Sequence, residues 1–501
     1  MRKTYRGSIT VYLCLCLALS IACTGVFLES ARIRGMVSRT DRTAHSALES
    51  VMADYNRTIM EAYDLFLLDY GRKTENRREV QARWKTYFEK ESDEAAGSFI
   101  YELLFDSEWF SIQEPDCRIT SVWTLLDKEG QIFANQAAQY MKYREVGNLV
   151  SRIMEQIKIM LKGKEGRDAL WQEGTKNSAE GAESTAWGDE FSISLSMVLP
   201  EGREVSDEKI SAEGLPSQIQ GISSQGPGQS PVWNEISEEV LIGEYLLEHF
   251  PDFVDRAEQE KITCQLEYIL FGKLSDRSNM ARMADLLLAV RSGLNLISLL
   301  SSEEMQAAAE AAAAAISAVL LNPELAPLIQ IVLECIWAYR EAVRDVAALL
   351  KGEKISFLKK DSQWMESLVP FGQSAETDEN AGEIGAAAQQ TGEVMSVIEE
   401  LKDIGSQAGE IRSVELSYQD YIRLFLLLLS PKVKYYRAMD MMQVHMQMTC
   451  PVFRISDCIC GMEASVVVKG KPKFFLFASQ FFFPGEIKKQ YEITRKVSFL
   501  Y

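Results

Sequence analysis

Positive charge is scarce in this chain, and its shortage excludes one class of partner. The 501 residues hold 53 Lys and Arg against 72 Asp and Glu, which gives a formal net charge of −19. A surface that binds nucleic acid needs clustered Lys and Arg to displace counterions from phosphates, so we expect no nucleic acid partner. With 47% hydrophobic and 25% charged residues, the chain is otherwise globular in composition and long enough for two or three cores.

The motifs of common catalytic centres are also missing. Only three histidines occur, and none stands in a pair at the helical spacing of a metalloprotease. The chain has no G-x-S-x-G nucleophile elbow, no phosphate-binding G-x-x-x-x-G-K-[ST] loop and no G-x-G-x-x-G. We therefore predict that the protein is not an enzyme and has no cofactor.

Nine cysteines are too scattered for a disulfide scaffold, and the three nearest the N-terminus lie in an apolar run. One set, His445 with Cys450, Cys458 and Cys460, has residue types that bind metals. Zinc sites, however, usually contain C-x-x-C pairs, and buried cysteines in strands are common without any metal. We predict no metal site.

The first 35 residues carry the most informative feature of the chain, a basic leader followed by a long apolar run. Arg2, Lys3 and Arg6 stand in the leader, and the apolar run covers 8–28. About twenty residues at 1.5 Å each span roughly the 30 Å hydrocarbon core of a bilayer. We predict a transmembrane helix over 8–28, which makes the lipid bilayer the first expected partner.

Three interpretations of this segment remain open. It is an uncleaved signal anchor, a cleaved secretory signal, or a pilin-type leader with its processing site between Gly7 and Ser8. A lipoprotein cleavage box before Cys23 is incomplete, because Ser20 stands where an aliphatic residue is required. Basic residues flank the run on both sides, so the positive-inside rule does not decide the orientation.

Most of the remaining chain has the periodicity of helices, which predicts an α+β protein that is predominantly α. Apolar residues from Ala44 to Ala62 recur at three- and four-residue steps, so we expect the membrane helix to continue as a long amphipathic helix to about Asp69. We expect this helix to pack on its own domain, and the alternative is an assembly stripe as in a pilin stalk. Strong helical signals over 233–370 predict a helical bundle core.

Strand-like alternation is confined to a few segments. It appears at 117–126 and in a C-terminal group made of 453–459, 463–468, 473–483 and the tail 491–501. We expect a small antiparallel sheet that includes the C-terminal strands and is joined by 117–126. Residues 114–116 (Glu-Pro-Asp) are expected to form a turn, and 191–200 a further strand.

The predicted organisation follows the chain in seven parts. They are a basic leader (1–7), the transmembrane helix (8–28), a long helix plus an α/β segment (29–162), a flexible linker with one short apolar segment (163–232), the helical bundle (233–370), an acidic flexible linker (371–414), and helices followed by antiparallel strands (415–501).

The start and the exit of the apolar run resemble a known group of proteins. The run begins RGSITV (6–11) and ends LESAR (28–32). These segments resemble the R-G-x-x-x-V start and the acidic-x-x-Arg exit of TadE/TadG-type pseudopilins from tight-adherence (Flp) pili. The membrane-exit motif is then Glu29 and Arg32. We expect Glu29 to pair with Arg32 or Arg34, and the alternative is that it neutralises the N-terminus of a neighbouring subunit. Pilins usually carry Glu where this chain has Tyr12.

Six further segments extend the resemblance over most of the chain. They are YDLFLLDYG (63–71), QYMKYRE (139–145), LEYILFGK (266–273), ALLKGEKI (348–355), LSYQDYIRLFLLLL (416–429) and CICGMEASV (458–466). Together they resemble a large uncharacterised family of membrane-anchored proteins from clostridium-like bacteria, a domain of unknown function whose members accompany Flp-type pilus or secretion genes. The resemblance implies a single-pass protein of the cytoplasmic membrane with a large extracytoplasmic C-terminal domain, and it transfers no catalytic residue.

These observations favour a non-enzymatic, membrane-anchored extracytoplasmic protein. It would be an accessory or pseudopilin-like component of a Flp/Tad-type pilus or secretion system, with pilin or pilus-assembly proteins bound through the N-terminal helix. The alternative is a cell-surface ligand-binding or sensor module, with an apolar pocket between the bundle over 234–350 and the C-terminal sheet. A third hypothesis, a cell-envelope hydrolase, requires clustered carboxylates with shifted pKa values in a cleft.

Overall fold

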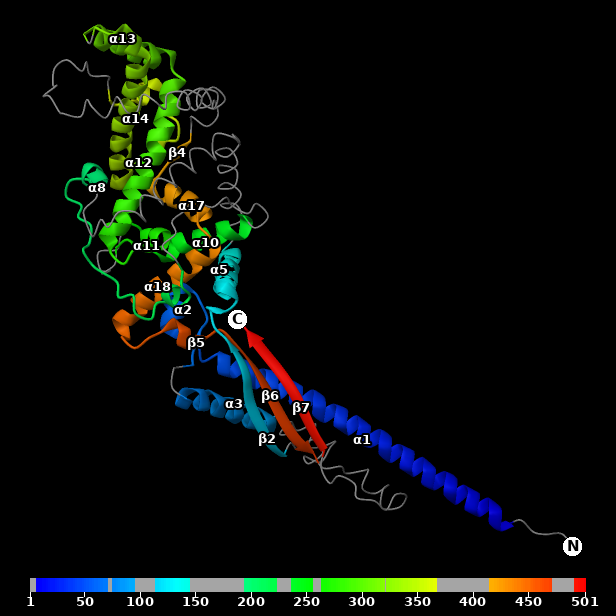
Figure 1. Cartoon of the computed structure of the whole chain (residues 1–501). Coiled ribbons are helices and arrows are strands. Elements are labelled where there is room, and N and C mark those ends of the chain that lie inside the picture. Colours follow the sequence, from blue (N-terminus) through cyan, green and yellow to red (C-terminus); the bar gives the residue numbers. More distant parts are fainter. Residues whose placement is uncertain are drawn as a thin grey trace. The chain divides into compact units, whose positions relative to one another are not determined.

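The computed structural model of the chain (Figure 1) describes residues 6–70, 74–94, 113–144, 193–222, 236–255, 263–319, 321–366, 414–470 and 491–501. The chain forms two compact units. Unit 1 is made of Met1–Ile132 and Val452–Tyr501, and unit 2 of Phe133–Pro451. The structure is mostly helical with small antiparallel sheets, which confirms the predicted fold class.

A single long helix, α1 (Arg6–Met52), begins unit 1. It contains the predicted membrane segment, and the presence of a long apolar N-terminal helix is therefore confirmed. After residue 28 one face of α1 becomes buried against α3 (Thr74–Glu94) and the sheet, with Ala44 and Leu48 completely enclosed. This helix packs on its own unit, as we expected.

The prediction that α1 continues to about Asp69 is wrong, because the helix ends at Met52. Asn56 explains the break. Its backbone is extended, and its side-chain oxygen accepts the N–H groups of the second and third residues of α2 (Arg57–Tyr63). Asparagine favours this capping position over a helix interior. The apolar stripe therefore continues across two helices.

Three strands form an antiparallel sheet in unit 1. They are β2 (Gln113–Trp123), β6 (Gly461–Gly470) and β7 (Tyr491–Leu500), in the order β2-β6-β7 (Figure 1). The prediction of a sheet that joins the C-terminal strands to the segment near 117–126 is confirmed. Alternate side chains of β6 are buried and build the core of unit 1 with α1 and α3: Met462, Ala464, Val466 and Val468.

The predicted turn at 114–116 is instead an irregularity inside β2. Gln113 pairs with Lys469 of β6, and Asp116 pairs with Val467. The chain therefore advances three residues along β2 while it advances two along β6. Such an extra residue is a β-bulge. Pro115 lies within it and has no N–H to donate to the ladder, which explains why proline is tolerated at this point.

A second, two-stranded sheet in unit 1 pairs two of the motif segments. β1 (Leu68–Asp69) belongs to YDLFLLDYG and pairs antiparallel with β5 (Cys458–Ile459) of CICGMEASV. Two of the motif segments that lie far apart in the sequence are thus paired in the structure.

Unit 2 is built from helices of varied length. They are α5 (Gln131–Tyr143, which begins in unit 1), α8 (Ile193–Val198), α9 (Pro216–Ile219), α10 (Ile236–His249), α11 (Gln265–Phe271), α12 (Asp276–Leu300), α13 (Glu303–Val319), α14 (Ala326–Lys351), α17 (Tyr418–Leu428) and α18 (Pro431–Thr449). In unit 2, β3 (Ile355–Ser356) and β4 (Glu415–Leu416) form one short antiparallel ladder. The described residues also form short 3-10 turns: η2 (Asp127–Gly130) and η7 (Ile455–Asp457) in unit 1, and η3 (Pro323–Leu325) and η4 (Asp361–Gln363) in unit 2.

The helices of unit 2 pack as two adjoining groups. α12 and α13 both pack against α14, while α10 packs against α17 and α11 against α12 and α18. The helices over 415–449 therefore belong to the same unit as the predicted bundle, whereas the strands that follow belong to unit 1. The predicted strand at 473–483 and most of the two predicted linkers lie outside the described residues.

The strand expected at 191–200 is wrong, because the structure has the helix α8 there. The polar and apolar residues alternate, but the two enclosed side chains are Leu195 and Val198. Residues three apart lie on one side of a helix, and α8 uses that side to pack against α12 and α14. A six-residue segment is too short for the two periodicities to be separated from sequence alone.

Two helices in the described part of the chain are long and apolar enough to cross a bilayer, α1 and α12. Their environments differ. The apolar window of α1 has none of its residues buried, whereas 61% of the α12 window is buried in unit 2. α12 is thus a core helix of unit 2, and the buried Arg291 in its middle agrees with this.

Candidate functional site

The residues singled out in the N-terminal segment lie on α1. Gly7 and Ser8 stand in its first turn. Glu29 and Arg32 lie one turn apart where packing begins, and Arg32 Nη1 donates to Glu29 Oε1 at 2.8 Å with both side chains at most 6% exposed. Arg32 also hydrogen-bonds the hydroxyl of Tyr491 on β7. The exit motif is therefore part of the contact that holds α1 on the sheet.

Unit 2 buries a set of charged and tyrosine side chains that come from the motif segments LEYILFGK and LSYQDYIRLFLLLL. Glu267 is the central member of one cluster and has no exposed surface. Its Oε1 accepts hydrogen bonds from the Tyr418 hydroxyl at 2.6 Å and from the Phe253 N–H at 3.0 Å. Its Oε2 accepts no hydrogen bond from the residues that the structure describes.

Asp252 lies near the start of the α10–α11 connection, is 1% exposed, and is close enough for its charge to raise the pKa of Glu267. Its Oδ1 accepts the N–H groups of Val254 and Asp255, both at 2.7 Å, while its Oδ2 has no partner. The Gln419 side chain also hydrogen-bonds this carboxylate. The two enclosed carboxyl groups thus interact through their charges, and each has one oxygen without a hydrogen bond to any residue that the structure describes.

The pKa values of this acid pair follow from its burial. Desolvation, and then the charge of Asp252, raise the pKa of Glu267 to about 8, against the opposing hydrogen bonds from Tyr418 and Phe253. Desolvation also raises the pKa of Asp252. The pKa of Tyr418 is raised well above its ordinary value by burial and by the facing carboxylate. At neutral pH the cluster therefore retains a proton.

A second buried cluster, around Arg291 on α12, is balanced in charge. Arg291 has no exposed surface, and its Nη2 contacts Asp345 Oδ2 on α14 at 2.6 Å. Its Nη1 donates to the carbonyl oxygens of Ser356 and Phe357, both at 3.1 Å. Lys359 follows on the same segment and pairs with Asp345 and with Glu341. Two cations and two carboxylates hold the segment 355–366 on α12 and α14, which is a structural task.

A third cluster surrounds Asp440 on α18. Its oxygens accept the N–H of Ser217 and the hydroxyl of Tyr268, each at 2.9 Å. Burial raises the pKa of Asp440 to about 6. Arg437, one turn earlier, donates to the carbonyl oxygens of Ile269 and Leu270 at the end of α11. These contacts complete the backbone hydrogen bonds of short elements that have too few residues to do so themselves.

The aromatic and basic residues of QYMKYRE pack on α10. The ring of Tyr140 lies 6.1 Å from that of Tyr245 and 5.5 Å from that of His249, measured between centroids. The Arg144 guanidinium covers Tyr140 at 5.6 Å and pairs with Glu248. The rings and the guanidinium of this segment are therefore used in packing.

The cysteines that we considered as a possible metal site, Cys450, Cys458 and Cys460, have separate environments. Cys460 Sγ donates to the Trp123 carbonyl at 3.2 Å and Cys458 Sγ to that of Arg454 at 3.9 Å, both thiols being enclosed in unit 1. Cys450 is exposed. Within the residues that the structure describes, no group of three or more His, Cys, Asp or Glu side chains is placed to hold a metal ion.

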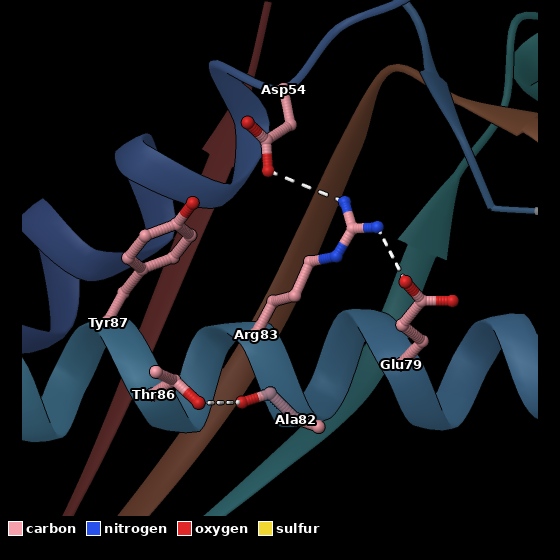
Figure 2. A pocket seen from close by; sticks show the side chains of 6 residues that line it. All are labelled: Asp54, Glu79, Ala82, Arg83, Thr86 and Tyr87. Atoms are coloured by element: carbon pink, nitrogen blue, oxygen red, sulfur yellow. Dashed lines mark hydrogen bonds and ion pairs between the residues drawn. The ribbon is translucent and has the colours of Figure 1, made fainter.

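A surface hollow of about 420 Å³ lies in unit 1 where α1 ends beside α3. Figure 2 shows Arg83 reaching between Glu79 and Asp54. Its Nη2 lies 2.6 Å from Glu79 Oε1, and its Nη1 lies 3.5 Å from Asp54 Oδ2. Tyr87 and Thr86 complete the wall. The hydrogen bond and charge of Glu79 raise the pKa of Arg83. All three charged side chains are at least 40% exposed, so the hollow is polar and open to water.

Sequence reasoning named none of the residues of the acid pair. The available signal was a glutamate inside the apolar run LEYILF, since a charged residue on the inner side of a short helix must be paired or neutralised. The identity of its partner was not accessible, because Asp252 and Tyr418 are 15 and 151 residues away and meet Glu267 only through tertiary packing.

Comparisons with known proteins identify a family without a known activity. A family of unknown function, DUF5702, matches residues 175–470, which is more than half of the chain. No curated protein and no solved structure matches the chain. The matched region includes the acid pair, both other buried clusters and strand β6. The chain therefore belongs to the family of unknown function DUF5702.

Proposed function

We propose that the protein is a non-enzymatic, single-pass membrane protein whose helix α1 anchors the rest of the chain outside the cytoplasmic membrane. The observation that carries this proposal is the change of environment along α1. Large apolar side chains from Ile9 to Leu28 are 41–75% exposed, and from Glu29 on one face of the same helix is buried in unit 1. A bilayer removes the first part from water, and this transfer is favourable by roughly 25 cal/mol for each Å² of apolar surface that is buried.

The continuity of α1 supports a mechanical role for the anchor. The helix runs without interruption from the apolar segment into the core of unit 1. The buried Glu29–Arg32 pair and Met36, whose sulfur accepts from the Tyr491 hydroxyl at 3.1 Å, hold it on β7. Because of this junction, a movement of the membrane helix would move unit 1 with it.

Within this class we propose an accessory or pseudopilin-like component of a Flp/Tad-type pilus or secretion system. The RGSITV start and the LESAR exit support this role through their resemblance to pseudopilins. The partners would be pilin or pilus-assembly proteins that contact residues 8–28 beside the bilayer. Tyr12 in place of the usual Glu suggests an accessory position, since it changes the residue that pilins use in polymerisation.

A pull-down with an exchanged helix tests this role. The tagged full chain is purified from membranes in mild detergent, beside a variant whose residues 8–28 are replaced by an unrelated transmembrane helix of the same length. We expect pilus-assembly proteins to be recovered with the native chain and not with the variant, although both chains remain in the membrane. Equal recovery with both chains, or no pilus protein with either, contradicts the role.

The ligand-binding alternative has one observation in its favour, the hollow of Figure 2. Its volume lies within the range of small-molecule sites, but charged side chains form its wall, whereas such sites are mostly apolar. A thermal-shift screen with cationic and anionic envelope fragments tests it. A shift that disappears in Arg83→Ala would favour binding there, and no shift with any fragment counts against it.

A further inference from the structure

Unit 2 contains a backbone turn that is hydrogen-bonded to two buried acids, Asp252 and Glu267. Three consecutive backbone N–H groups, those of Phe253, Val254 and Asp255, are each bonded to one of these two carboxyl groups. The carbonyl of Pro251 in turn accepts the N–H of Gln265 at the start of α11. The conformation of the turn at 252–255 therefore depends on the state of the two acids.

The surroundings of the acid pair contain no cation that neutralises it among the residues that the structure describes. Tyr418 and Gln419 of α17 contact it, Met280 of α12 lies against the Tyr418 hydroxyl at 3.8 Å, and Cys264 precedes α11. Asp255 adds negative charge. Arg203, the cation on this side, donates instead to the carbonyl oxygens of Phe253 and Val254.

Protonation of one of the two acids lowers the cost of burying both of them. Glu267 Oε2 and Asp252 Oδ2 are both enclosed, and neither has a hydrogen bond to the part of the chain that the structure describes. Two ionised carboxylates in this position would be buried, unpaired and mutually repelling, which strongly disfavours the closed turn. One bound proton removes a charge and supplies a donor.

We propose that Asp252 and Glu267 hold one proton between them at neutral pH and act as a pH-sensitive latch on the turn at 252–255, which loosens as the medium becomes alkaline. The raised pKa of Glu267, about 8, agrees with this device. The latch does not depend on the proposed anchoring role. If unit 2 lies outside the cytoplasmic membrane, the latch senses the pH of the external medium.

The sign of the effect follows from proton linkage. When the turn opens, Glu267 meets water and regains an ordinary pKa of roughly 4.3. Between that value and about 8 the closed form holds a proton that the open form has lost, so rising pH favours opening. The opening constant is expected to rise roughly tenfold for each pH unit over this interval and to level off above about pH 8.

Amide hydrogen exchange on the full chain in detergent micelles measures this constant. After correction for the intrinsic rates, the amides of 253–255 should lose protection with rising pH from about 5 to about 8. Glu267→Gln, which cannot ionise, should remove this slope. Glu304→Gln, which changes an exposed glutamate on α13, should retain it.

Two further measurements keep the proposal testable if Glu267→Gln does not fold. Infrared spectra of the native chain should show a protonated carboxylic acid at pH 7 whose signal falls to half near pH 8. Tyr418→Phe removes a hydrogen bond that favours ionised Glu267, so it should move this loss to higher pH. A native chain without the carboxylic acid signal, or an unchanged slope in Glu267→Gln, overturns the latch.

Discussion

Gly272 shows at the scale of one residue how a backbone position depends on a buried neighbour. It ends α11 with a φ of 65°, and an added Cβ would lie 2.5 Å from Nε of Arg437. That arginine donates to the last carbonyl groups of α11. The glycine is thus required both by its left-handed conformation and by the close approach of Arg437.

Gly272→Ala should therefore destabilise unit 2 by about 3 kcal/mol, of which roughly 1–2 kcal/mol is the left-handed conformation itself. Urea unfolding followed by the far-ultraviolet signal measures the loss. Gly202→Ala is the matched control, because Gly202 also has a positive φ, 82°, but nothing lies within 4 Å of the added atom. Equal losses in both variants would show that the approach of Arg437 is unimportant.

Arg291 tests the buried charges at the same scale. Arg291→Met leaves Asp345 enclosed with only Lys359 as its cation, and we expect a loss of about 3–5 kcal/mol. Arg340→Met, which removes a half-exposed partner of Glu366, should change stability by less than about 1 kcal/mol. The same urea titration compares them, and a small effect at Arg291 would mean that the network relaxes around the missing cation.

Individual elements show which structural features can be predicted from sequence. The alternation of β6 and the tail predicted the sheet of unit 1 correctly, because one buried face leaves a clear period of two. The strand expected at α8 was wrong because six residues do not separate the two periods. The Asp252–Glu267 pair was missed for a different reason: the side chains that satisfy a buried charge come from distant elements.

The break between α1 and α2 gives a test at this scale. Asn56→Ala removes the oxygen that accepts two N–H groups of α2, and we expect unit 1 to lose about 1 kcal/mol. Asn56→Asp keeps an acceptor and should stay close to the native stability. Urea unfolding measured through a fluorophore on unit 1 distinguishes the two. If both variants are as stable as the native chain, Asn56 does not determine where α2 begins.

At the scale of the whole molecule, the proposed function depends on where the chain lies relative to the membrane. The composition predicted no nucleic acid partner, and the apolar run indicated an anchor, but flanking basic residues left the orientation undecided. The structure adds that, in the part of the chain it describes, only the stretch of α1 before Glu29 presents apolar side chains on all sides, while α12 is a core helix of unit 2. This distribution supports one crossing, near the N-terminus.

Thiol labelling of intact spheroplasts tests this arrangement most directly. Cys450, at the end of α18, is exposed in unit 2 and is a suitable reporter for a maleimide that does not cross membranes. Cys450→Ser, with Cys335→Ser in both chains, measures the background from other thiols. We predict that Cys450 is labelled before the membrane is opened and that the chain stays in the membrane fraction. Labelling that appears only after lysis would place unit 2 in the cytoplasm and contradict the proposed orientation.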